Sequence, residues 1–153
     1  TGHALYLCKE YVHGTFLVMM ADDIHSARDI RAAIAGGNNV VLVKKSTKGF
    51  SGGKVVVDSD NTLVSIEEGT HEAGSLVNTA LYVLTDDIFN YPPVAIKEGK
   101  EFGLPQTIVA RMGTVKTVVV EAADGEHGGL VAADDHENDS HSAIAGREQR
   151  QAG

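Results

Sequence analysis

The clearest structural signal in this chain is Phe16-Leu-Val-Met-Met-Ala-Asp-Asp-Ile24, an apolar run of strand length that ends in two adjacent carboxylates. Such a run predicts a buried strand in a sheet covered on both faces. In open α/β sheets, ligands bind beyond the carboxyl ends of strands, where Asp22 and Asp23 would lie. Because Mg²⁺ prefers carboxylate oxygens and often shares them with substrate phosphates, the segment predicts a divalent-cation site. Capping of a helix that begins near Ile24 is the competing interpretation of Asp23.

The composition limits the class of protein. A chain of 153 residues is long enough for one domain with a core. No run approaches the roughly 18 uncharged apolar residues of a membrane-spanning helix. The first residues lack the pattern of a signal peptide, and the single cysteine, Cys8, excludes an intramolecular disulfide, so we expect a cytoplasmic protein. We expect Cys8 to be a small buried side chain on the apolar face of a helix rather than a reactive thiol.

The net charge of −8 is concentrated near the C-terminus. Residues 121–153 carry eight acidic and two basic side chains, a net charge of −6, which leaves −2 for residues 1–120. A nearly neutral body without a basic stripe argues against a nucleic-acid groove. Residues 122–153 are expected to form an acidic, poorly ordered tail. A Zn²⁺ or Ni²⁺ site among its carboxylates and His127, His136 and His141 is a rival hypothesis of a different class.

Predicted helices and strands alternate over residues 1–121, which we interpret as one domain. Helices are predicted over residues 4–12, 26–35, 86–90 and 104–112, and strands over 16–20, 40–43, 54–58, 62–66, 76–84 and 115–121. Ser26 is expected to cap the second helix. Helices that alternate with parallel-type strands, interrupted by a hairpin, predict an α/β layered fold with an inserted antiparallel element.

Five segments occur in one order and spacing: Gly2-His-Ala4 before a helix, Phe16 to Asp23, the hairpin segments Gly53 to Asp58 and Leu63 to Glu68, Val77-Asn-Thr-Ala-Leu-Tyr-Val83, and Glu101 to Ile108. Together they resemble the sugar nucleotidyltransferases, most closely the UTP:glucose-1-phosphate uridylyltransferases. The family equivalents include a strand ending in Ala-Asp-Asp, a sugar-facing hairpin and an Asn-x-Gly-x-Tyr strand. The resemblance implies part of a three-layer Rossmann-like nucleotidyltransferase fold, with a mixed sheet and an inserted β-hairpin.

The resemblance also implies a reaction. A hexose 1-phosphate would attack the α-phosphorus of UTP or dTTP, releasing pyrophosphate and leaving an NDP-sugar. Such transfer depends on positioning and charge neutralisation, so Mg²⁺ is the implied cofactor. Asp22 would be the catalytic metal ligand shared with the phosphates, and Asp23 would support it.

Four further residues would contact the substrates by the same resemblance. Glu68 and Asn78 would hydrogen-bond the sugar, Gly53 would let the sugar approach the backbone, and Gly2 would lie against the base. Each of three also has a purely structural interpretation: Glu68 as a solvated hairpin residue, Asn78 as a satisfied buried polar group, and Gly53 as part of a bulge or turn. Tyr82 is interpreted as core packing.

The departures from the family pattern point to an incomplete enzyme. The Gly-rich loop with its arginine and the lysine–proline pair are absent, Gly69 replaces a lysine, Ala80 replaces a glycine, and Asp134 is only a loose candidate for the second metal ligand. The chain is therefore interpreted as a truncated, split or degenerate nucleotidyltransferase. Its free sheet edge would favour self-association or a complementing N-terminal chain. The alternative function is a non-catalytic sugar-nucleotide-binding or assembly module.

Overall fold

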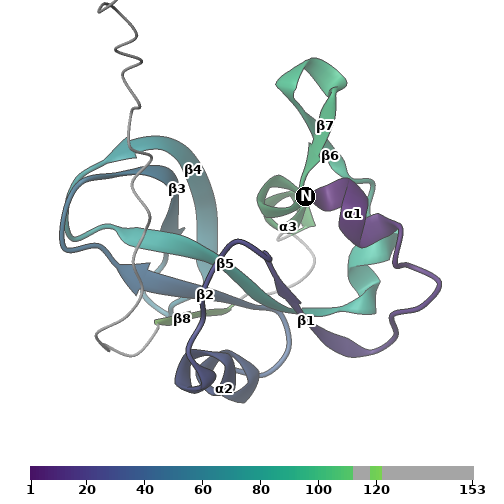
Figure 1. The fold of residues 1–153 in the computed structure, drawn as a ribbon, viewed down its shortest axis with the longest axis horizontal. Coiled ribbons are helices and arrows are strands. Elements are labelled where there is room, and N and C mark those ends of the chain that lie inside the picture. Colours follow the sequence, from purple (N-terminus) through teal and green to yellow (C-terminus); the bar gives the residue numbers. More distant parts are fainter. Residues whose placement is uncertain (112–117, 122–153) are drawn as a thin grey trace, which may run out of the picture.

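The computed structural model describes residues 1–111 and 118–121. The predictions about the acidic tail, its three histidines and Asp134 lie outside the described residues. Figure 1 shows a twisted sheet with α2 near one face and α1 and α3 displaced toward the other side. Among residues 1–111 and 118–121, no helix is long and apolar enough to cross a membrane.

The main sheet is built around β5. Its strands are β1 (Thr15–Met19), β2 (Val40–Lys45), β3 (Phe50–Val57), β4 (Leu63–His71), β5 (Leu76–Thr85) and β8 (Val118–Glu121). β5 pairs antiparallel with β1, β2 and β3, β4 extends the sheet from β3, and β8 pairs parallel with β2. The predicted β3–β4 hairpin is confirmed, and its short turn returns the chain directly into an antiparallel pair. The expectation of parallel-type strands is wrong for the pairs that β5 makes with β1, β2 and β3, and among the described strands only β2 and β8 pair parallel.

Helices and a small hairpin complete the described chain. They are α1 (Gly2–Tyr6), α2 (Ala27–Ala35), the 3₁₀ helix η1 (Asp86–Asn90), β6 (Val94–Ile96), the 3₁₀ turn η2 (Lys97–Gly99), β7 (Glu101–Gly103) and α3 (Leu104–Arg111). The predicted helices at α2, η1 and α3 and the strands at β2 to β5 are confirmed. The β6–β7 hairpin was not predicted, because strands of three residues are too short to show a periodicity.

The core lies on both faces of the sheet. Val41 and Tyr82 point toward α1, η1 and α3, where they pack with Ile88, Leu104 and other apolar residues. On the opposite face, Leu42 and its neighbours pack against α2. Successive residues of a strand point to opposite faces, so β2 and β5 contribute to both clusters. These two strands have the doubly covered environment that their apolar runs predict.

Two expectations near the N-terminus are wrong. The predicted helix over residues 4–12 ends at Tyr6, and a series of turns follows it. Cys8 is therefore exposed rather than buried, and its thiol donates to the carbonyl of Ala4 at 3.6 Å. A third expectation, that the run from Phe16 forms a buried strand covered on both faces, is also wrong: β1 is only half-buried, with Thr15 and Met19 exposed, because β5 is its one partner among the described strands.

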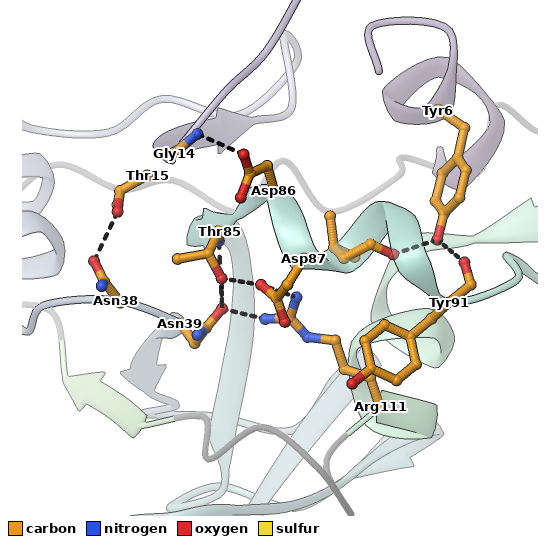
Figure 2. A network of polar contacts seen from close by, with 11 residues as sticks. Tyr6, Gly14, Thr15, Asn38, Asn39, Thr85, Asp86, Asp87, Tyr91 and Arg111 are labelled. Carbon is orange, nitrogen blue, oxygen red and sulfur yellow. Dashed lines mark hydrogen bonds and ion pairs between the residues drawn. The ribbon is translucent and has the colours of Figure 1, made fainter. Parts of the chain in front are cut away.

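A buried polar network joins α3 to the sheet (Figure 2). Arg111 is fully buried, and its guanidinium donates to the Asn39 carboxamide and lies 3.5 Å from a carboxylate oxygen of Asp87. The Thr85 hydroxyl lies within hydrogen-bond distance of side-chain oxygens of Asn39 and Asp87, and its one hydrogen can donate to either. Burial lowers the pKa of Arg111, while the negative charge of Asp87 raises it. The network ties the last helix to the start of β2 and the end of β5.

Candidate functional site

Asp22 and Asp23 lie in the turn that follows β1, and both are exposed. The backbone N–H of Asp23 donates to the carbonyl of Met20 at 3.4 Å, which closes this turn. α2 begins at Ala27, and its N-cap is Ser26, whose hydroxyl accepts from the N–H of Asp29 at 3.1 Å. The capping interpretation of Asp23 is therefore wrong, and the predicted cap at Ser26 is confirmed. Both carboxylates face solvent beyond the end of the strand.

Three of the predicted substrate residues come together on one face of the sheet. Gly53 of β3 pairs in register with Glu68 of β4. A Cβ at Gly53 would lie 3.3 Å from Oε1 of Glu68 and 3.4 Å from Cβ of Asn78, which lies on β5. A methyl carbon of Ile66 lies 3.2 Å from the same point, so the absence of a side chain at Gly53 lets these three neighbours approach its backbone closely. Because Gly53 lies in regular register, the bulge interpretation is wrong; the irregularity in this pair falls at Val56 and Val57.

The carboxamide of Asn78 is linked to Tyr82. Its Nδ2 donates to the Tyr82 hydroxyl at 2.8 Å, and its Oδ1 accepts from the N–H of Ala80 at 3.2 Å. Burial raises the pKa of Tyr82 to about 12, against the hydrogen bond from Asn78, and the charges of Glu68 and Asp23 raise it further. The negative charges of Glu68 and Asp23, from two different segments, thus both disfavour ionisation of this hydroxyl. We call Gly53, Glu68, Asn78 and Tyr82 the Glu68 cluster.

Tyr82 is the member of the cluster that sequence reasoning assigned only to the core. Its ring is in the core, with 1% of the residue exposed, so the packing interpretation is confirmed. Its hydroxyl nevertheless belongs to the polar face. The spacing of Asn78 and Tyr82 was the available signal, because residues four apart in a strand share a face.

Gly2 has a different environment from the other substrate candidates. It is buried in α1, where an added Cβ would lie 3.0 Å from the carbonyl oxygen of Phe102 in β7. α1 lies beside the β6–β7 hairpin and α3 in Figure 1, whereas β3 and β4 lie across β5 from it. The close packing of α1 against the hairpin therefore explains why a glycine is present at position 2. Its role at a nucleobase stays a prediction.

The backbone bears differently on two departures from the family pattern, since it accounts for Gly69 and opposes Ala80. Gly69 has φ of +151° and pairs with Gly52, whose φ is +147°. Side chains rarely adopt this conformation, so a lysine at position 69 would strain the hairpin. Ala80 has φ of +55° and lies in an irregularity where three residues of β5 face the single residue Leu42 of β2. A glycine would adopt this conformation without the cost that its methyl group imposes.

The donor set after β1 fits a hard cation of the magnesium type. Mg²⁺ keeps several waters and takes one or two protein carboxylates together with substrate phosphates. Asp22 and Asp23 are two exposed carboxylates of this kind. Within residues 1–111 and 118–121, no group of three or more His, Cys, Asp or Glu side chains is placed to hold a metal. Any magnesium bound here would therefore depend on phosphate and water oxygens for most of its ligands.

Comparisons with protein-family models and with curated proteins find no match. Solved structures do match. A Bacillus anthracis protein assigned as a glucose-1-phosphate thymidylyltransferase, in complex with a sucrose, aligns with a TM-score of 0.63 at 20% identity over 80% of this chain and 52% of its own. The inositol-1-phosphate CTP transferase from T. maritima aligns with a TM-score of 0.59 at 18% identity, over 79% of this chain and 51% of its own. A UDP-glucose pyrophosphorylase from Acinetobacter aligns with a TM-score of 0.57 at 16% identity, over 80% of this chain and 48% of its own.

This chain has a nucleotidyltransferase fold. The alignments cover about four fifths of its length, and the fold class implied by the five sequence segments is confirmed. The chain spans about half the length of each of these solved structures. TM-scores of 0.57–0.63 establish the fold, whereas identities of 16–20% leave the reaction and the substrates of this chain to be argued from its own residues.

Proposed function

We propose that this chain is part of a sugar nucleotidyltransferase that acts on UTP or dTTP and a hexose 1-phosphate. The observation that carries the proposal is the convergence of Gly53, Glu68 and Asn78 on one face of the sheet. A carboxylate and a carboxamide beside bare backbone are suited to sugar hydroxyls, which both donate and accept hydrogen bonds. The nucleotidyltransferase fold supports the same assignment.

In the proposed reaction, an oxygen of the sugar phosphate forms a bond to the α-phosphorus, and the bond to the departing pyrophosphate breaks. The protein needs no nucleophilic side chain, because positioning and charge neutralisation supply most of the acceleration. Glu68 would orient the sugar by accepting from its hydroxyls. Asp22 would hold Mg²⁺ with the phosphates, and Asp23 would support Asp22. The metal would neutralise developing charge on the phosphate oxygens.

The first test is a calorimetric titration of the chain with UDP-glucose, with and without Mg²⁺. We expect saturable binding that strengthens with Mg²⁺, and we expect Asp22→Asn to lose the metal-dependent part. Asp60→Asn is the control, because Asp60 is an exposed carboxylate in the turn between β3 and β4. Failure of the folded chain to bind UDP-glucose would contradict the proposal.

Adjacent glutamates offer a sharper control for the sugar contact. Glu67 and Glu68 follow one another on β4, so their side chains point to opposite faces. Glu67 lies 3.5 Å from Lys54, whereas Glu68 lies over Gly53. Glu68→Gln should weaken binding of UDP-glucose about tenfold or more, the size of a lost charge-assisted hydrogen bond. Glu67→Gln should leave the Kd unchanged, and equal effects of the two changes would argue against a sugar site on this face.

A non-catalytic sugar-nucleotide-binding module is the second candidate, and the backbone at Gly69 favours it. The hairpin conformation there disfavours the lysine that the family places near the sugar phosphate. Binding and turnover separate the candidates. Release of pyrophosphate from UTP and glucose 1-phosphate supports the enzyme, whereas UDP-glucose binding without pyrophosphate release supports the binding module.

A further inference from the structure

The carboxamide of Asn78 is held at both ends by the protein itself. Oδ1 accepts from the backbone N–H of Ala80, and Nδ2 donates to the hydroxyl of Tyr82. The backbone donor sets the orientation, because a flipped amide would turn its NH₂ group toward another donor. One hydrogen on Nδ2 and one lone pair on Oδ1 remain for a ligand.

The partner of this amide is fixed in turn by the core. Tyr82 pairs with Val18 of β1 on one side and with Val41 of β2 on the other. Its ring is buried among the residues that cover this face, so its hydroxyl has little freedom to move away from Asn78. A rigid supporting group of this kind can hold a binding side chain in one orientation.

We propose that Tyr82 is the positioning residue of the Glu68 cluster, because its hydroxyl holds the Asn78 carboxamide in the orientation that binds a sugar hydroxyl beside Glu68 and Gly53. Tyr82 acts through Asn78 and makes no contact with the ligand, since its ring is covered. The inference rests on the proposed function, which supplies the sugar nucleotide that the amide would bind.

The test is a double-mutant cycle in the full chain, with UDP-glucose titrated into wild type, Tyr82→Phe, Asn78→Ala and the double variant. Tyr82→Phe removes one oxygen and keeps the ring that packs in the core. We expect it to raise the Kd about five- to tenfold, the size of one lost hydrogen bond. We expect the double variant to bind no more weakly than Asn78→Ala, because Tyr82 acts only through that side chain.

Tyr6→Phe is the matched control. The Tyr6 hydroxyl lies within hydrogen-bond distance of the carbonyls of Ile88 and Tyr91 and donates its one hydrogen between them, so this change also removes a hydrogen-bonded phenol, at a place outside the Glu68 cluster. It should lower the melting temperature and leave the Kd at the wild-type value. A general loosening of the core would instead affect binding in both tyrosine variants.

A second readout needs no ligand. In the wild type, the Nδ2 hydrogen of Asn78 that is bonded to the Tyr82 hydroxyl should exchange slowly with solvent, and Tyr82→Phe should accelerate its exchange. Additive losses in the cycle, or a wild-type Kd in Tyr82→Phe, would overturn the inference while the proposed function stands. If the wild type itself shows no saturable binding, the proposed function is overturned and the inference falls with it.

Discussion

Tyr82 belongs to the core through its ring and to the candidate site through its hydroxyl. Sequence reasoning identified the first role from an aromatic residue in an apolar strand. The second role depends on Asn78 and on charges from two other segments, those of Glu68 and Asp23. A single strand pattern carries no information about which segments lie nearby, so the hydroxyl could not be assigned from the sequence.

The raised pKa of Tyr82 predicts a pH dependence of stability. Its value is about 12 in the folded chain against 10.0 for an ordinary tyrosine. Above pH 10 the unfolded chain ionises first, so the contribution of Tyr82 is fully present below pH 10 and is lost as the pH rises toward 12. The loss is about 2–3 kcal/mol in the free energy of unfolding.

Urea unfolding of wild type and Tyr82→Phe between pH 8 and 12 measures this loss. The difference between the two proteins should shrink across the upper part of the range. Tyr11→Phe, which alters an exposed phenol, is the control and should follow the wild-type curve. A constant difference between wild type and Tyr82→Phe would show that the phenol ionises equally in both states.

Ala80 is the residue at which the backbone and the side chain conflict. Its φ of +55° disfavours any side chain. Ala80→Gly should raise the free energy of unfolding by about 0.5–1 kcal/mol, after the entropy cost of glycine is subtracted from the relieved strain. Ala80→Val should lower it, because a β-branched residue tolerates this conformation less well. Thermal denaturation of the two variants measures both changes. A higher free energy of unfolding in Ala80→Val would contradict the view that the backbone at Ala80 is strained.

At the scale of elements, α3 packs on the core through Leu104 and Ile108 and is linked to the sheet by one buried charged side chain. Arg111 ends this helix and reaches Asn39 and Asp87 (Figure 2). Arg111→Met should lower the free energy of unfolding by about 3 kcal/mol, because Asp87 and Asn39 lose a charged partner in a buried setting. Arg31→Met on the exposed side of α2 should change it by less than about 0.5 kcal/mol. Denaturant titration with both variants provides the measurement, and similar midpoints would show that the network contributes little.

The elements themselves were largely predictable. Ser26 before an amphipathic segment predicted the start of α2, and the alternation of apolar runs with turn residues predicted the strands from β2 to β5. α1 was predicted too long, because apolar residues beyond Tyr6 continued the helical spacing. Exposed Leu7 and Tyr11 show that these residues meet no core to stabilise another turn.

At the scale of the whole molecule, β5 organises the sheet, since β1, β2 and β3 all pair with it. Hydrogen exchange should therefore be slowest at its buried residues 81–84, whose exposed fractions are 4% or less. The β6–β7 hairpin, whose strands pair only with one another among the described strands, should exchange much faster. Amide exchange followed by NMR compares the two regions in one experiment. Equal protection would contradict a core centred on β5.

Amino-acid order was sufficient for the positions of most elements, for the fold class through the resemblance, and for the choice of Gly53, Glu68 and Asn78. These inferences use caps, periodicity and short motifs, which act within one element or one hairpin. Tertiary structure decided the antiparallel pairing around β5, the burial of Arg111 and the approach of Glu68 to Gly53 beside Asn78. Arg111 and Asn39 are 72 residues apart, and their contact depends on how every intervening element packs. No local pattern specifies that packing, because it is set by the joint burial of apolar side chains on both faces of the sheet.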